Sequence, residues 1–274
     1  LTDDAEAAIG AHRQVLELDP EHSASRRALE RLFERTGRWQ DLAVLLRAEL
    51  DRANPEEQIG LTQRLGMIHE TRLSLPEKAV DHYEQVLQRE INHKHAREAL
   101  ERLIEDRSQR QRCALILEPI YEERGDWPEL VETLQVQLED LSDAGKRVNL
   151  LGRIAGLQED RLHDPAAAFS SIAAAVKTDP SESMMREELQ RLARMRDAER
   201  ERAEVLEVAL QKSGDSPSLR SELLLELAKL WDDAVNDVDQ AETAYQRLIE
   251  ASPGDPDIIL QASQALERIH LGQG

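Results

Sequence analysis

Apolar residues recur along the whole chain at spacings of three and four, the period at which they form one face of a helix. No segment alternates apolar and polar residues for long enough to predict a strand. Asn54-Pro55, Asp164-Pro165 and Ser216-Pro217 each place a capping residue before a proline, as at a helix start. We therefore predict an all-α protein of about 15 helices, at residues 3–21, 22–36, 39–53, 56–73, 76–90, 93–107, 109–124, 127–141, 144–162, 165–178, 182–196, 198–213, 217–234, 238–251 and 256–270.

Two internal duplications organise these helices. Ala-Leu-Glu-Arg-Leu at 28–32 recurs at 99–103, 71 residues later, and a relative follows at 265–269. Gly37-Arg38-Trp39 recurs as Gly125-Asp126-Trp127, 88 residues later. Because the two offsets differ, we predict an additional helix near 109–124 and a kink between 107 and 145.

A second pattern marks individual helices. It is an alanine, a bulky residue four positions on, a small or branched residue three further, and in three cases a proline five further. In three cases a Leu-Gly or Leu-Ala-like pair lies in the preceding helix, at Leu65-Gly66, Ile154-Ala155 and Leu227-Ala228. The four occurrences are Ala8/His12/Val15, Ala79/Tyr83/Val86, Ala168/Ile172/Ala175 and Ala241/Tyr245/Leu248.

These spacings resemble the tetratricopeptide repeat (TPR) family, with divergent repeats. The resemblance implies antiparallel helix pairs stacked as one α-solenoid over residues 1–274. In that family the first helices of successive pairs line a concave groove that holds a peptide or a partner helix. The corresponding positions here are Gln63, Met67, Glu70, Asn149, Glu159, Asp160, Glu222, Lys229, Asp232 and Asp233.

Charge narrows the choice of partner. The chain has 55 acidic and 35 basic residues, a net charge of −20, with residues 201–250 the most acidic. Such a balance disfavours nucleic acid and anionic membrane as ligands, and no apolar run is long enough for membrane insertion. We expect a protein or peptide partner that is basic or amphipathic.

Candidate chemistry is sparse. The sequence lacks a phosphate-binding glycine loop and a nucleophile elbow. His93 and His95 are the only close histidine pair, to which His82 could be added. His22 and His93 occupy matching places at helix starts, where a polar residue caps the helix or faces water, and this favours a structural role over metal binding. The lone Cys113 lies on an apolar stripe, as a buried structural thiol does. We assign no catalytic, cofactor-binding or metal-binding residue and do not expect an enzyme.

We therefore expect a non-catalytic scaffold or adaptor whose groove binds a partner protein. Two alternatives stay open: a structural subunit that associates through solenoid edges or ends, including with itself, and the regulatory repeat region of a longer enzyme. The chain begins at Leu1 and has no targeting segment in view, so we expect a fragment of a longer array and a cytoplasmic location.

Overall fold

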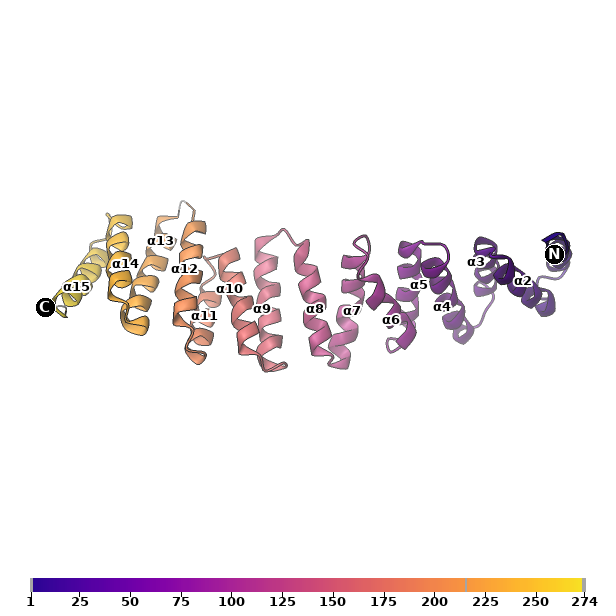
Figure 1. Cartoon of the computed structure of the whole chain (residues 1–274), viewed down its shortest axis with the longest axis horizontal. Helices are drawn as coiled ribbons and strands as arrows, with labels where there is room; N and C mark the ends of the chain where they lie inside the picture. The colour runs from indigo at the N-terminus through magenta and orange to yellow at the C-terminus, as the bar shows by residue number, and fades with distance from the viewer. Residues whose placement is uncertain (1, 215, 273–274) are drawn as a thin grey trace. The chain divides into compact units, whose positions relative to one another are not determined.

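The computed structural model describes residues 2–214 and 216–272, and all fifteen predicted helices are present in them (Figure 1). A short π-helical segment, η1, continues α13. The elements are α1 (Thr2–Leu18), α2 (Ser23–Thr36), α3 (Trp39–Leu50), α4 (Pro55–Thr71), α5 (Pro76–Arg89), α6 (Lys94–Leu103), α7 (Arg110–Arg124), α8 (Trp127–Glu139), α9 (Ala144–Asp160), α10 (Pro165–Thr178), α11 (Ser183–Met195), α12 (Glu199–Lys212), α13 (Pro217–Lys229), η1 (Leu230–Val235), α14 (Val238–Ala251) and α15 (Pro256–Gly272).

The helices form two compact units, an N-terminal unit (Leu1–Gly125) and a C-terminal unit (Asp126–Gly274). Within each unit, helices that follow one another in sequence pack side by side. The all-α class is confirmed. One continuous solenoid and a kink between 107 and 145 stay predictions.

Local side chains set the helix ends. Asn54 and Glu57 form a capping box, and the Asp164 carboxylate accepts from two backbone amides at the start of α10. His22 and His93 each accept a backbone N–H on Nδ1 at 3.2 Å, so of the two predicted roles, capping or facing water, both side chains cap their helices. The predicted helix 93–107 ends at Leu103, because Asp106 accepts from the backbone N–H and hydroxyl of Ser108 and forms a turn.

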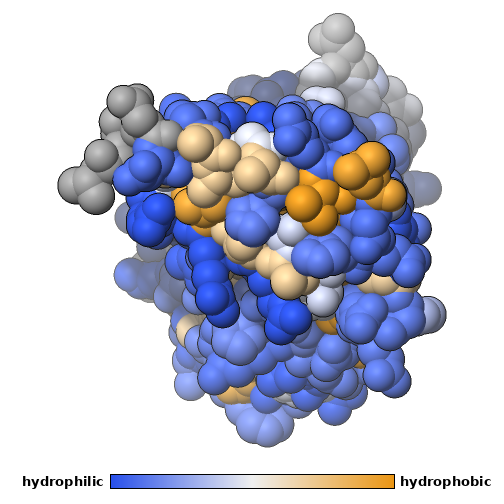
Figure 2. All heavy atoms as spheres, turned by 90° about the vertical axis from the view of Figure 1, so that its right-hand side faces the viewer, coloured by the Kyte–Doolittle hydropathy of each residue, from blue (hydrophilic) through white to orange (hydrophobic). Residues whose placement is uncertain are grey.

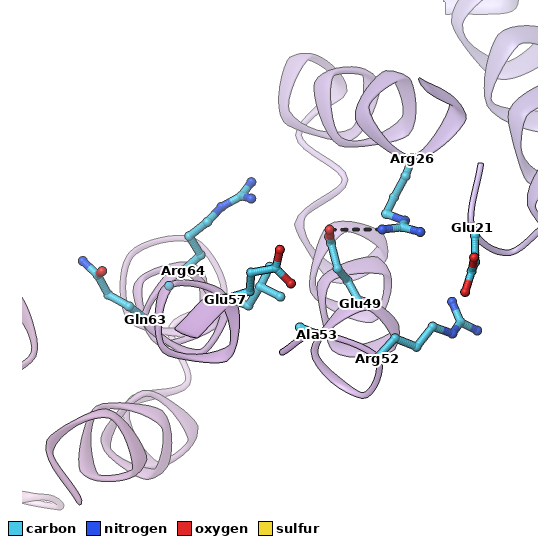
Figure 3. A pocket seen from close by; sticks show the side chains of 10 residues that line it. Glu21, Arg26, Glu49, Arg52, Ala53, Glu57, Gln63 and Arg64 are labelled. Carbon is cyan, nitrogen blue, oxygen red and sulfur yellow. Dashed lines mark hydrogen bonds and ion pairs between the residues drawn. The ribbon is translucent and has the colours of Figure 1, made fainter. Parts of the chain in front are cut away.

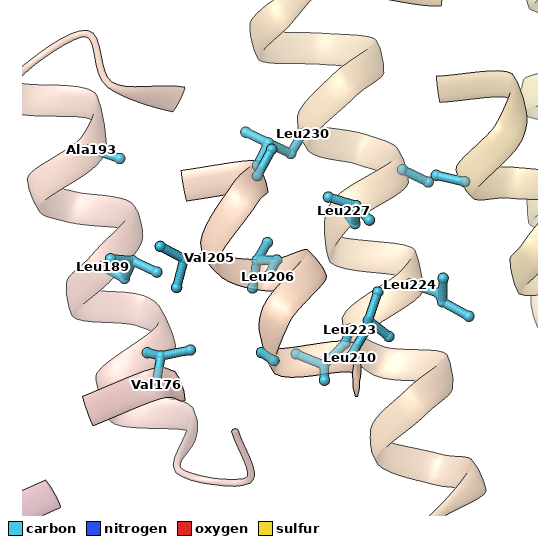
Figure 4. Close-up of a cluster of buried hydrophobic side chains, with 14 of the residues drawn as sticks. Val176, Leu189, Ala193, Val205, Leu206, Leu210, Leu223, Leu224, Leu227 and Leu230 are labelled. Carbon is cyan, nitrogen blue, oxygen red and sulfur yellow. The ribbon is translucent and has the colours of Figure 1, made fainter. Parts of the chain in front are cut away.

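Each unit has its own apolar core. In the N-terminal unit Phe33, Leu42 and Leu65 lie at the centre of a cluster that α1 to α4 build. In the C-terminal unit one large cluster runs through α9 to α15, and Figure 4 shows Leu189, Leu206 and Leu227 converging in it from three different helices. Stacked pairs of this kind bury their apolar faces against neighbours in sequence.

Small residues bring the paired helices together. Ala79, Ala168 and Ala241, the first residues of three of the four predicted patterns, are fully buried, as is Ala228 in helix α13. Ala8, the first residue of the fourth pattern, is only half-buried. At Gly66 a Cβ atom would lie only 2.8 Å from Cε1 of the buried Tyr83 ring. The pairs α4/α5, α9/α10 and α13/α14 therefore pack as the tetratricopeptide resemblance implies.

We predict that Gly66→Ala destabilises the N-terminal unit by about 1–3 kcal/mol, because Tyr83 is buried and cannot move aside. Gly60 is the matched control in the same helix: a Cβ there meets nothing within 4 Å. Gly60→Ala should stabilise the helix by about 0.5–1 kcal/mol. Urea unfolding followed by circular dichroism measures both, and equal effects of the two substitutions would contradict the prediction.

Candidate functional site

The predicted groove residues divide between the two units. Gln63, Met67 and Glu70 lie on α4 in the N-terminal unit, and the other seven lie on α9, α13 and η1 in the C-terminal unit. Apart from Gln63, which is half-buried, they fall into two classes, side chains held in ion pairs and side chains open to solvent. The two classes differ in what they can offer a partner.

Gln63 lines a hollow of about 710 Å³ between α2, α3 and α4 (Figure 3). Its walls are charged with both signs: Arg26 pairs with Glu49 at 3.3 Å on one side, and Arg64 comes from α4 on the other. Arg64 itself pairs with Glu30 of α2 at 2.7 Å. The hollow is therefore a polar seam between neighbouring helices, most of whose charges already have partners.

Glu70, near the end of α4, links three helices. Its carboxylate accepts from the Tyr83 hydroxyl of α5 at 2.7 Å and from Arg102 of α6 at 3.1 Å. Only 14% of the Glu70 side chain is exposed. Burial and the hydrogen bond to the Glu70 carboxylate raise the pKa of Tyr83 well above its usual value. This carboxylate is thus a structural link.

Glu159 has the same role at the end of α9. It forms an ion pair with Arg191 of α11, which also donates from Nε to Glu188 at 2.9 Å. The two carboxylates stabilise the charged guanidinium and raise the pKa of Arg191. One arginine therefore joins α9 to α11 and shares its charge between two acids.

Asp232, in η1, repeats the arrangement once more. It pairs with Arg268 of α15 and accepts from the Tyr245 hydroxyl of α14 at 3.2 Å. Burial together with the Asp232 charge raises the pKa of Tyr245 to about 12. The position of Tyr245 relative to Asp232 matches that of Tyr83 relative to Glu70, thirteen residues in both cases.

The structure therefore separates three embedded acids from the open positions. Glu70, Glu159 and Asp232 each have an arginine partner and hold helices together. Glu222 is 58% exposed and contacts Arg186 at 3.3 Å. The remaining groove residues are exposed: Met67, Asn149, Asp160, Lys229 and Asp233.

The sequence does not by itself identify these arginines as the partners of the groove acids. Arg102 and Arg268 are the fourth residues of the Ala-Leu-Glu-Arg recurrence, and Arg191 lies in the related Leu189-Gln190-Arg191-Leu192. Each arginine lies a similar distance along the chain after the acid it pairs with: 32 residues for Glu70–Arg102, 36 for Asp232–Arg268 and 32 for Glu159–Arg191. The recurrence is visible in the sequence, but which acid each arginine pairs with depends on how helices two places apart stack.

Other candidate chemistry is accounted for by packing. Cys113 is fully buried, and burial raises its thiol pKa to about 12, which keeps it protonated. Among residues 2–214 and 216–272, no group of three or more His, Cys, Asp or Glu side chains is placed to hold a metal ion. In the same residues, no helix combines the length and hydrophobicity needed to span a bilayer.

The comparisons with known proteins found structural neighbours but no relative in sequence. No family model matches the chain, and no curated protein matches it in sequence. Similar solved structures are mostly TPR proteins. They include the TPR2AB domain of yeast Sti1 in complex with pHSP90 (16% identity, 84% of this chain and 92% of that one, TM-score 0.35).

Two further neighbours are bacterial. One is the C-terminal part of a TPR repeat-containing protein from Cytophaga hutchinsonii (10% identity, 94% of both chains, TM-score 0.30). The other is PilF of Pseudomonas aeruginosa (15% identity, 95% and 99%, TM-score 0.30). At these scores none of them carries an argument about what this chain binds.

Proposed function

We propose that this chain of TPR-type helix pairs is a non-catalytic scaffold that binds a basic or amphipathic segment of a partner protein. The observation that supports the proposal is the set of acids left open on first helices of pairs in the C-terminal unit, Asp160 and Asp233, with Glu222 largely exposed beside its arginine. Residues 126–274 hold 30 acidic and 16 basic residues, a net charge of −14 out of −20. Such a surface attracts cationic segments.

The open and the embedded acids allow a sharp test. Reversing Asp160 and Asp233 together, as Asp160→Lys and Asp233→Lys, changes the surface charge by four without removing a known ion pair. We expect this variant to lose its partner in affinity capture from native lysate read by mass spectrometry, while its thermal unfolding is unchanged. Capture of the same partner by both proteins would contradict the acidic-groove proposal.

The matched control is Glu159→Gln with Asp232→Asn, which removes the embedded charges. Because these two carboxylates pair with Arg191 and Arg268, their loss should lower stability while the open acids still bind the partner. The control separates partner recognition from folding. A partner lost in both variants, together with a lowered unfolding temperature in both, would be explained by a weakened fold alone.

A structural assembly role is the second candidate. Leu18 at the end of α1 is 89% exposed, and Leu271 on α15 is 76% exposed. Figure 2 shows the N-terminal side of the molecule, where hydrophobic side chains lie among a mostly hydrophilic surface. Association through such side chains would appear as a mass in light scattering that rises with concentration and does not respond to salt.

A further inference from the structure

An apolar groove lies between α5 and α7 in the N-terminal unit. Its volume is about 420 Å³, and its walls are built mainly by Leu87, Ile91, Leu115, Ile116 and Pro119. Leu115 is 60% exposed, and Leu87 at the base is buried. A groove of this size lies in the range of small binding sites and admits one or two large side chains.

An ion-pair brace bridges the two helices beside this groove. Arg112 of α7 pairs with Asp81 and Glu84 of α5, at 2.6 and 2.5 Å. In the C-terminal unit the corresponding helices α10 and α12 pack directly together, and Ala173 stands at the place of Glu84, 89 residues later. Ala173 is buried in the same core cluster as Val205 and Leu206 of α12. Where α10 and α12 pack directly together, this position holds the small apolar Ala173. Where the groove separates α5 and α7, the same position holds the charged Glu84.

The polar side chains that line the groove are Glu84, Gln88 and Arg112, and two further features favour an occupant with a donor or a positive charge. Pro119 lies inside α7 and has no N–H, so the helix supplies no donor for the carbonyl of Leu115, four residues earlier. At the other side, Asp81 and Glu84 share a single guanidinium, which leaves one negative charge in excess. An occupant must therefore bring apolar surface together with a donor or a positive charge.

We propose that the α5/α7 groove binds an amphipathic helix of a partner protein. The helix places one side chain of leucine or phenylalanine size against Ile91, Leu115 and Ile116, and a lysine or arginine about one turn away reaches toward Asp81 and Glu84. This face consists of different residues from the open acids Asp160 and Asp233. Either proposal can therefore fail while the other stands.

The test uses the full chain and a labelled synthetic peptide of about 14 residues, four helical turns, with leucines on one face and lysines on the other. Fluorescence anisotropy measures its binding. Leu115→Glu should weaken the affinity about tenfold or more, because the substitution removes the leucine side chain that the bound peptide would bury. Leu260→Glu is the matched control: Leu260 is 57% exposed on α15, and the substitution adds the same charge. It should leave the affinity unchanged.

Two matched peptides test the chemistry of the occupant. A peptide with alanine in place of leucine keeps the charge, and one with glutamate in place of lysine keeps the apolar face; both should bind more weakly. Hydrogen exchange on the wild-type chain gives an independent location, with protection expected at residues 84–91 and 112–120 when the leucine–lysine peptide is bound. This measurement does not depend on any variant folding.

Several results would overturn the proposal. They are equal affinity for Leu115→Glu and wild type, an alanine–lysine or leucine–glutamate peptide that binds as tightly, protection elsewhere in the chain, or no binding at all. A dimer in sedimentation that Leu115→Glu dissociates would assign the groove to a second copy of the chain. Loss of partner capture in Asp160→Lys/Asp233→Lys would bear only on the acidic surface.

Discussion

Glu226→Gln is expected to destabilise the C-terminal unit by about 2–4 kcal/mol, because it leaves a buried guanidinium with only its longer contact to Glu199. Arg202 is only 4% exposed and donates from Nη2 to Glu226 at 2.5 Å. Its Nη1 is 3.4 Å from Glu199, and its Nε is buried with no hydrogen-bond partner. Glu226 therefore supplies most of the negative charge that balances the Arg202 guanidinium, and this ion pair joins α12 to α13.

Arg202→Met is the matched control. It removes the buried charge itself and keeps an unbranched apolar side chain in its place. Glu226 is 25% exposed and keeps its contact with Arg186, so the loss should be below about 1.5 kcal/mol. Urea unfolding at neutral pH, followed by hydrogen exchange in α12 and α13, distinguishes the two variants. A larger loss for Arg202→Met than for Glu226→Gln would contradict this account.

The same arginine shows where the sequence interpretation was wrong. Arginines and glutamates interleave along this part of the sequence, a pattern that predicts a salt-bridged face in solvent; the arginines are Arg186, Arg191, Arg194, Arg196, Arg200 and Arg202. The ion pairs are present, but the side chains of Arg186 and Arg202 are 11% and 5% exposed. Charge alternation along a helix predicts pairing, but burial depends on which face meets the next helix.

Helix positions were predictable because their signals are local. Proline with a preceding Asn, Asp or Ser marks the starts of α4, α10 and α13, and glycine in the left-handed region ends α2 and α7. The helix ends were less predictable. Helices α1 and α3 each end three residues earlier than predicted, and α6 ends four residues earlier because a side-chain turn at Asp106 replaces its last helical turn.

Site residues were harder to predict because their state depends on distant partners. Glu159 and Asp160 are neighbours of the same charge, yet Arg191 pairs with the first, while the second is exposed. Only the stacking of α9 against helices two places later distinguishes them. The sequence could therefore place the candidate face, but not tell its structural acids from its available ones.

Histidine packing provides the second large expected effect, an acid sensitivity confined to the N-terminal unit. The rings of His69 on α4 and His82 on α5 stack with centroids 5.1 Å apart, and both side chains are at least nine-tenths buried. His69 donates from Nδ1 to the carbonyl of Leu65 at 2.8 Å, while Nδ1 of His82 has no partner. Two buried imidazoles in contact favour the neutral form.

The direction of the pH effect follows from these surroundings. Burial, followed by the nearby His69, Arg47 and Lys78, lowers the pKa of His82 to about 4 against an opposing effect of Asp81; burial also lowers the pKa of His69. In the unfolded chain both titrate near the usual 6.5. The unfolded state therefore binds more protons between these values, and stability is present above about pH 6.5 and lost as pH falls toward 4. His82 alone accounts for up to about 3 kcal/mol.

The chain carries its own control for this prediction. Gln158 and Ser171 occupy the places of His69 and His82, 89 residues later, and form a buried hydrogen bond of 2.7 Å. Grafting this pair as His69→Gln with His82→Ser should remove most of the loss in α4 and α5 between pH 7 and 5, measured by hydrogen exchange with correction for intrinsic rates. Peptides from α9 and α10 serve as the internal reference. The carboxylates of the unit are the same in both proteins, so a pH dependence that survives the graft would assign the acid sensitivity to groups other than the two histidines.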